Sequence, residues 1–200
     1  MSFPFSPTDG QTYTTALGVQ YRYDSAKTAW ISISSPSYPT YQFSADQFDS
    51  PVTSDWTVGN PAPLAADTTN SSLLVRRFDD STSMGVGFEI KLPSASNITF
   101  DFAGRAETAP GVTQLVDLHV MARSIPDNAT IGGWNGVQLS QSYSIPTNTN
   151  FRYFTQTVTY SALSVSANTV TQFELVRDGG DSSDTLVGNW DLNHVRVTFS

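Results

Sequence analysis

Apolar and polar residues alternate along several short segments of this chain. The alternating segments span residues 72–78, 86–92, 97–104, 115–122, 151–160, 170–176 and 191–199. Because the side chains of a β-strand point alternately to opposite faces, a period of two predicts a strand with one face on a core. Clusters of Gly, Pro, Asn, Asp and Ser between these segments are typical of turns. We therefore expect an all-β fold, an antiparallel β-sandwich or jelly roll.

The first 44 residues differ from the rest in their pattern of strands and turns. Residues 7–33 predict a small β unit of three strands, with a tight turn at Leu17 and Gly18 after the first strand and a short loop before the last. Residues 34–44 are rich in Pro, Ser and Tyr and predict an extended linker. We place the domain boundary after residue 44, so that residues 1–44 form the N-terminal unit and linker and residues 45–200 form the sandwich.

The N-terminal unit carries four aromatic side chains, those of Tyr13, Tyr21, Tyr23 and Trp30. A unit of this size is too small to bury a core of its own. We therefore expect these aromatic residues to pack on another protein or on a second copy of the chain, and to serve attachment or oligomerisation.

Composition and charge exclude several classes of function. The chain has 200 residues and a formal net charge of −8, which repels nucleic acid and anionic membrane surfaces. Because it has no cysteine, neither disulfides nor cysteine catalysis are expected. No segment is apolar over the length needed to cross a bilayer. The first residues lack the pattern of a secretory signal, so release with assembled particles is one route to the outside.

The two histidines lie in alternating segments beside other polar residues. Asp117 and His119 share one face of their segment, and His194, Arg196 and Thr198 share one face of theirs. No Gly-x-Ser-x-Gly motif accompanies them, so a Ser-His-Asp hydrolase is not expected. A glycosidase with two carboxylates stays open, because spacing in sequence says nothing of separation in space.

A glycine- and serine-rich loop carries Asp178, Asp181 and Asp184. Calcium prefers oxygen ligands at every second position with a closing Glu, whereas these aspartates are three residues apart. We expect a long hairpin loop in which Gly179 and Gly180 take unusual dihedral angles and the aspartates cap turns. Calcium binding by the three aspartates is the alternative, and no other cofactor is expected.

Three tryptophans lie near Gly and Asn at expected strand edges: Trp56, Trp134 and Trp190. Aromatic rings beside amides and carboxylates can hold sugars, so Trp134 and Trp190 are candidate glycan-binding residues. The alternative is that these rings close the ends of the core, where most tryptophans are well buried.

Both parts of the chain resemble proteins of tailed bacteriophages. The N-terminal unit resembles a short aromatic and glycine unit of phage structural and fibre proteins, through the residues Asp9, Gly10, Tyr13, Gly18, Tyr21, Tyr23, Asp24 and Trp30. The remainder resembles a C-terminal module found in phage virion genes, in the segments DWTVGNPAP, RSIPDN and FELVRDGGDSSDTLVGNWDL among others. Neither motif is catalytic, and the resemblance assigns no site residues.

The resemblance implies a non-enzymatic protein of the virion surface, either a capsid decoration protein or a short fibre. Its expected partners are other capsid or tail proteins and two further copies in a homotrimer. Such a protein is made in the host cytoplasm without a signal peptide. The alternative hypothesis is a carbohydrate-binding module of a tail fibre that recognises a host surface glycan. An enzyme that acts on surface polysaccharide is a third hypothesis.

Overall fold

The structure is a computed structural model, and it describes residues 3–16, 18–33, 38–49, 60–68, 72–125 and 139–200. Apart from the last residue, the chain divides into two compact units, Met1–Pro39 and Thr40–Phe199. Each unit is described by itself.

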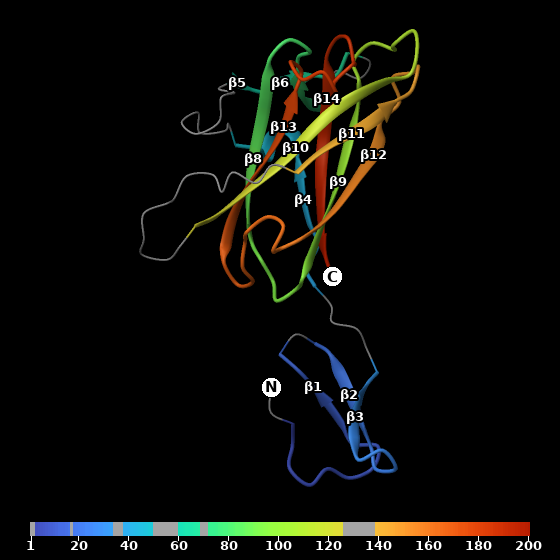
Figure 1. The fold of residues 1–200 in the computed structure, drawn as a ribbon, viewed down its shortest axis with the longest axis vertical. Coiled ribbons are helices and arrows are strands. Elements are labelled where there is room, and N and C mark those ends of the chain that lie inside the picture. Colours follow the sequence, from blue (N-terminus) through green and yellow to red (C-terminus); the bar gives the residue numbers. More distant parts are fainter. Residues whose placement is uncertain (1–2, 17, 34–37, 50–59, 69–71, 126–138) are drawn as a thin grey trace. The chain divides into compact units, whose positions relative to one another are not determined.

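The N-terminal unit is one antiparallel sheet of three short strands (Figure 1). The strands are β1 (Thr12–Thr14), β2 (Gln20–Asp24) and β3 (Ala29–Ser32), with β2 in the middle. The chain turns between β1 and β2 at Gly18, whose φ of +78° favours glycine because a Cβ atom would come too close to the residue's own carbonyl oxygen. The three strands predicted from the sequence are therefore confirmed.

The second unit is a β-sandwich of two sheets. Its five-stranded sheet has the order β11, β10, β13, β8, β5. The bounds are β11 (Leu139–Ile145), β10 (Gln114–Ile125), β13 (Val170–Asp178), β8 (Ser83–Lys91) and β5 (Asn60–Pro61). All pairings in this sheet are antiparallel except that of β5, which lies parallel to β8.

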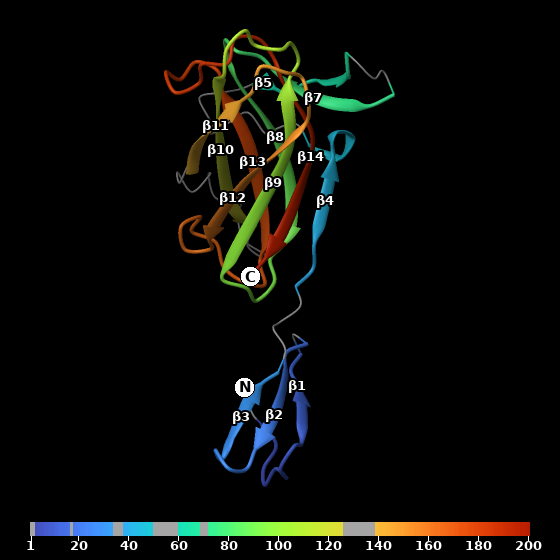
Figure 2. The same cartoon turned by 90° about the vertical axis from the view of Figure 1, so that its right-hand side faces the viewer.

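The six-stranded sheet has the order β12, β9, β14, β7, β6, and β4 also pairs with β14 (Figure 2). The bounds are β12 (Arg152–Thr159), β9 (Asn97–Ala106), β14 (Trp190–Phe199), β7 (Leu74–Phe78), β6 (Leu64–Ala66) and β4 (Tyr41–Ser44). In the described residues the only helix is a short 3-10 turn, Ala45–Gln47, and no helix could cross a membrane.

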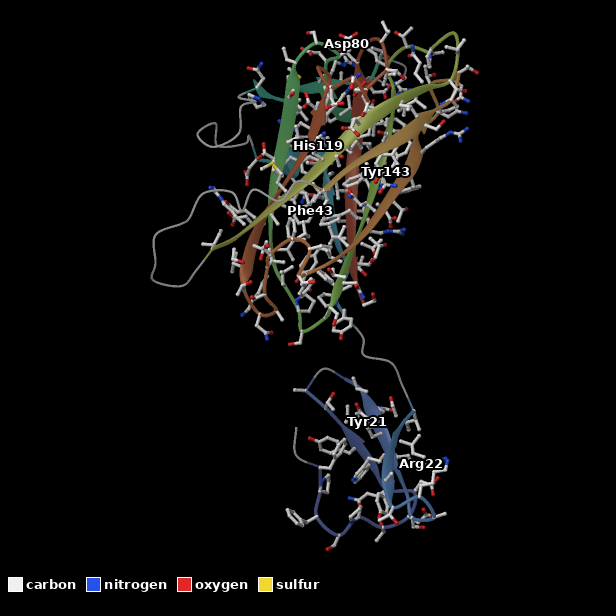
Figure 3. The ribbon with its side chains drawn as sticks, in the orientation of Figure 1. Tyr21, Arg22, Phe43, Asp80, His119 and Tyr143 are labelled. Atoms are coloured by element: carbon white, nitrogen blue, oxygen red, sulfur yellow. The ribbon has the colours of Figure 1, made fainter. Side chains whose placement is uncertain are left out.

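Aromatic rings from both sheets fill the space between them. Phe88 and Phe173 of the five-stranded sheet stack at 5.6 Å between ring centroids, and Phe100 of the other sheet meets Phe173 edge-on at 5.3 Å. Phe43 and Tyr143, labelled in Figure 3, pack on or within the same core. Burying a Phe side chain contributes about 1.5–3 kcal/mol, so these rings hold the two sheets together.

All seven alternating segments are strands, and the prediction of an all-β sandwich is confirmed. The predicted boundary after residue 44 is wrong by five residues, because β4 (Tyr41–Ser44) pairs with β14 and so belongs to the sandwich. Tyr41 and Phe43 of β4 face the core, and the two polar residues of the strand face solvent. An alternation of only four residues next to two prolines was too short to predict a strand.

Candidate binding surface

The outer face of the six-stranded sheet presents an exposed tyrosine in a row of side chains from four strands. Tyr153 on β12 lies opposite Ala103 on β9, which lies opposite His194 on β14, and His194 lies opposite Ser44 on β4. Tyr153 is 61% exposed. The small side chain of Ala103 lets the rings of Tyr153 and His194 meet edge-on, with 5.6 Å between their centroids.

The next row on the same face contains an ion pair. Thr155, Asp101, Arg196 and Gln42 lie opposite one another across the same four strands. The Arg196 guanidinium donates to Oδ2 of Asp101 from Nε at 3.0 Å and from Nη2 at 2.7 Å. The Thr155 hydroxyl donates to Oδ1 of the same carboxylate at 2.6 Å. Both oxygens of Asp101 are therefore engaged within the sheet.

The positive charge of this face resides on Arg196. Hydrogen bonding to Asp101, followed by its charge, raises the pKa of the Arg196 guanidinium further. Burial, with a smaller effect of the Arg196 charge, lowers the pKa of His194 below its ordinary value. His194 is therefore neutral around pH 7, and the guanidinium carbon of Arg196 lies 5.8 Å from the centroid of the Tyr153 ring.

This arrangement suits a ligand with an apolar face and polar edges. The Tyr153 ring offers a surface on which an apolar face can stack, and the side chains of the second row offer hydrogen-bond donors and acceptors beside it. We call the two rows, Tyr153 to Ser44 and Thr155 to Gln42, the Tyr153 face. The signal for it was present in the sequence, since Tyr153 lies on the polar side of an alternating segment.

Trp190, predicted as a candidate glycan-binding residue, lies in the core instead. Its side chain is fully buried and packs beside Phe78, at 5.4 Å between ring centroids, and Phe154, at 6.3 Å. The indole lies directly over the backbone of Gly104. A ring enclosed in this way cannot stack on a sugar, so the prediction for Trp190 is wrong and its alternative as a core residue holds. Trp56 and Trp134 lie outside the described residues.

The aspartate loop is not a hairpin, because β13 and β14 belong to different sheets. The predicted turn caps are confirmed: Asp178 accepts from the backbone N–H of Gly180 at 3.3 Å and Asp181 from that of Ser183 at 2.7 Å. The prediction of unusual dihedral angles at Gly179 and Gly180 is wrong. Gly179 is required for another reason, since a Cβ there would lie 2.7 Å from a backbone carbon of Asp80, which Figure 3 labels near this loop.

Asp184, the third aspartate of the loop, neutralises a buried arginine. Arg177 is fully buried and donates to both oxygens of Asp184, from Nε at 2.8 Å and from Nη2 at 2.9 Å. Asp184 also accepts from the backbone N–H of Leu186 at 3.1 Å. Within the described ranges no group of three acidic or histidine side chains is arranged to hold a metal. The ion pair of Arg177 with Asp184 gives this loop a structural role, and calcium binding stays an untested alternative.

The four aromatic residues predicted to attach the N-terminal unit pack on one another and on Phe3. Phe3 stacks on Trp30 at 5.3 Å between centroids and meets Tyr13 at 5.3 Å and Tyr21 at 5.1 Å edge-on. Tyr23 lies 5.5 Å from Trp30. All five side chains stay partly exposed, so this cluster is a small core with an accessible surface.

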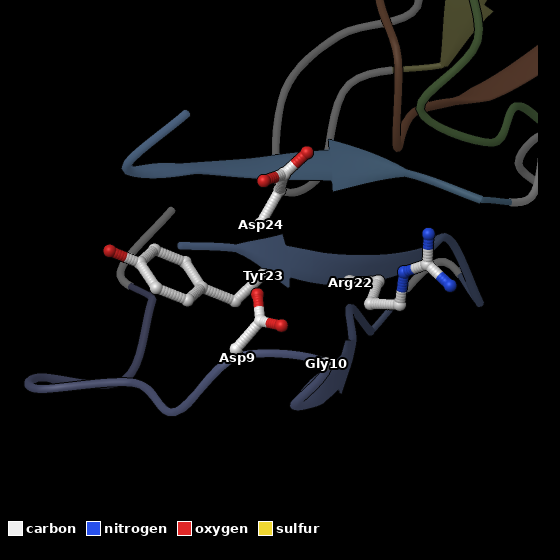
Figure 4. Close-up of a pocket in the computed structure, with 5 residues that line it drawn as sticks. All are labelled: Asp9, Gly10, Arg22, Tyr23 and Asp24. Carbon is white, nitrogen blue, oxygen red and sulfur yellow. The ribbon is translucent and has the colours of Figure 1, made fainter. Parts of the chain in front are cut away.

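A polar depression lies elsewhere on the N-terminal unit, between Asp9, Gly10, Arg22, Tyr23 and Asp24 (Figure 4). The backbone N–H of Ser25 donates to Asp9 at 2.8 Å, and this bond is the main reason for the lowered pKa of that carboxyl. The Arg22 guanidinium points away from both carboxylates (Figure 4). The bond from Ser25 to Asp9 fixes a turn beside this depression.

The outer face of the five-stranded sheet carries buried ionisable groups. As expected, His119 lies near Asp117, with 2.6 Å between Nε2 and Oδ2, and the Ser142 hydroxyl donates to the same carboxylate at 3.0 Å. Glu174 is also buried, and its Oε2 has no hydrogen-bond partner among the residues that the structure describes. Burial raises the pKa of Glu174 to about 7, against a smaller opposing effect of the Arg123 charge. Sequence analysis did not single out Glu174.

Comparisons with known proteins find similar folds. No protein-family model matches the sequence, and no curated protein matches it. A family 35 carbohydrate-binding module from Clostridium thermocellum is 10% identical, with a TM-score of 0.47 over 82% of this chain and 100% of that one. A CBM35 module from Cellvibrio japonicus Abf62 is 14% identical, with a TM-score of 0.43 over 80% of this chain and 93% of that one.

A phage protein is among the similar structures. The enzymatically active domain of tailspike protein 4 from bacteriophage CBA120 is 10% identical, with a TM-score of 0.38 over 81% of this chain and 19% of that one. These likenesses concern the β-sandwich, a jelly-roll fold that carbohydrate-binding modules also have. At these scores and identities they carry no argument about a ligand.

Proposed function

We propose that this chain is a non-enzymatic carbohydrate-binding protein whose sandwich holds a glycan on the Tyr153 face. The observation that carries the proposal is the largely exposed ring of Tyr153 beside the ion pair of Arg196 with Asp101. A sugar ring has one apolar face and a rim of hydroxyl groups. It stacks on Tyr153 through that face and exchanges hydrogen bonds with the neighbouring row.

Glycan-array binding by the purified chain and two variants tests this proposal. Tyr153→Ala removes the ring and should weaken binding by about twofold to tenfold, because such a stacking contact contributes roughly 0.5–1.5 kcal/mol. Tyr153→Phe keeps the ring and should bind within about threefold of the natural chain, since the stacking contact is unchanged. Val187→Ala, at an exposed loop position, serves as the surface control. Equal binding by Tyr153→Ala and the control would overturn the proposal.

The N-terminal unit is proposed to attach the chain to a partner. Domains below about 40 residues seldom fold without added support, and this unit ends at Pro39. Its partly exposed aromatic cluster of Phe3, Tyr13, Tyr21, Tyr23 and Trp30 would gain burial from a protein surface or from copies of itself in a trimer. Because β4 belongs to the sandwich, the truncation that separates the two roles removes residues 1–39.

Placement on a phage virion is proposed from the sequence resemblance alone. The truncated chain lacking residues 1–39 should remain folded, bind glycan as before and no longer associate with particles. Cryo-electron microscopy of intact particles carrying the natural and the truncated chain checks this. Density of the truncated chain on particles would contradict attachment through the N-terminal unit, and the absence of the natural chain from particles would contradict the virion placement.

A further inference from the structure

The two partners of the Tyr153 face ion pair differ in exposure. The Arg196 side chain is 49% exposed, whereas that of Asp101 is 10% exposed. Asp101 is covered by the groups that bond it, the guanidinium on one oxygen and the Thr155 hydroxyl on the other. A ligand that approaches this row therefore meets the cation and not the anion.

The guanidinium has an unused edge. An arginine presents donors along two edges that match a carboxylate or sulfate, one formed by Nε with a terminal nitrogen and one by the two terminal nitrogens. Asp101 occupies the edge of Nε and Nη2. The hydrogen bonds of Arg196 in the described part of the chain leave Nη1, and with it the second edge, without a partner.

The surroundings do not cancel this positive charge. Apart from Asp101, the two rows of the Tyr153 face contain no carboxylate. The carboxylate of Asp46 lies beyond the end of the first row, where the Ser44 hydroxyl donates to it at 2.8 Å. The face thus exposes a cation on a chain whose formal net charge is −8. Because the chain as a whole repels anions, an anion binds at this face only through direct contact with that cation.

We propose, on the basis of the proposed function, that the Tyr153 face selects acidic glycans, in which an anionic group of the sugar meets Arg196. The sugar ring stacks on Tyr153, and the anion accepts two hydrogen bonds from the free edge of the guanidinium. The 5.8 Å between guanidinium and ring centroid places both contacts within one sugar residue. Carboxylates and sulfates share this chemistry, and the test has an arm for each.

Matched glycan pairs test the selectivity. Oligogalacturonate is compared with its methyl ester, and dextran sulfate with dextran, by calorimetric titration at low and high salt. We expect the acid of at least one pair to bind more than tenfold tighter than its neutral counterpart, and the difference to shrink as salt rises. Equal affinity for acid and neutral forms in both pairs would overturn the selectivity, as would the absence of any binding to the acids.

Variants of Arg196 and of Tyr153 separate a failure of this inference from misfolding and from a failure of the proposed function. Arg196→Gln removes the cation but leaves Asp101 without its counter-charge, so Arg196→Gln combined with Asp101→Asn is measured beside it. Both should lose the preference for the acidic probe, and thermal unfolding shows whether each is folded. If a folded double variant keeps the preference, the assignment to Arg196 is wrong. Tyr153→Ala should weaken acidic and neutral glycans alike, and its failure to do so contradicts the proposed function instead.

Discussion

Adding a single methyl group at Gly104 should disrupt the core beneath the six-stranded sheet. A Cβ built on Gly104 would lie 2.1 Å from Cζ2 and 2.5 Å from Cε2 of Trp190. Real Cβ atoms do not approach so closely, and the indole is rigid and fully buried. Gly104→Ala must therefore displace the ring against Phe78 and Phe154. Such overpacking costs about 1–3 kcal/mol, and the rigid neighbour places this substitution near 3 kcal/mol.

Urea denaturation followed by far-UV circular dichroism measures this loss, and a thermal scan should show a midpoint lower by roughly 6–12 °C. Gly111→Ala is the matched control, because nothing lies within 4 Å of its added Cβ, and it should change stability by less than about 0.5 kcal/mol. In a Trp190→Leu background the penalty of Gly104→Ala should shrink. If Gly104→Ala behaves like Gly111→Ala, Trp190 does not occupy this core position.

Two further predictions concern the buried ionisable side chains of Asp184 and Glu174. Asp184→Asn should destabilise the sandwich by about 3–5 kcal/mol, because it leaves Arg177 buried without a counter-charge, whereas Asp181→Asn should leave the urea midpoint unchanged. Equal midpoints for the two variants would contradict the structural role of Asp184. Burial raises the pKa of Glu174 to about 7 from 4.5, so the fold retains a proton that the unfolded chain releases, and stability is lost as pH rises between these values. The free energy of unfolding of the natural chain relative to Glu174→Gln should therefore fall by up to about 3 kcal/mol between pH 4.5 and pH 8, and a flat difference would show that Glu174 ionises normally.

Local sequence patterns were sufficient for the strands whose alternation runs over seven or more residues. The shorter strand β4 (Tyr41–Ser44) and the serine-rich strand β11 (Leu139–Ile145) were missed. Each pairs with a long strand, β14 or β10, and the pairing partner decides their conformation more than their own composition does. The aspartate loop was misjudged for the same reason. Alternation in the two flanking segments predicts two strands, but it cannot say that they lie in different sheets.

The residues of the candidate site are far apart in the sequence, so the sequence alone does not predict that they are in contact. Tyr153, His194 and Ser44 come from three strands that are far apart in sequence, and only the register of the sheet brings them into one row. Trp190 was expected at a strand edge because Gly and Asn precede it. Its depth is instead set by Gly104, 86 positions away, whose missing side chain makes room for the indole.

The most direct test of carbohydrate binding at the Tyr153 face is to map it by NMR. Isotopically labelled chain is titrated with the best glycan from the array, and shifts of backbone amide signals report the contact. The account predicts that the shifted amides cluster around Tyr153 and Thr155 on β12, Asp101 on β9 and the segment from His194 to Arg196 on β14. Shifts confined to the five-stranded sheet or to the aspartate loop would contradict it.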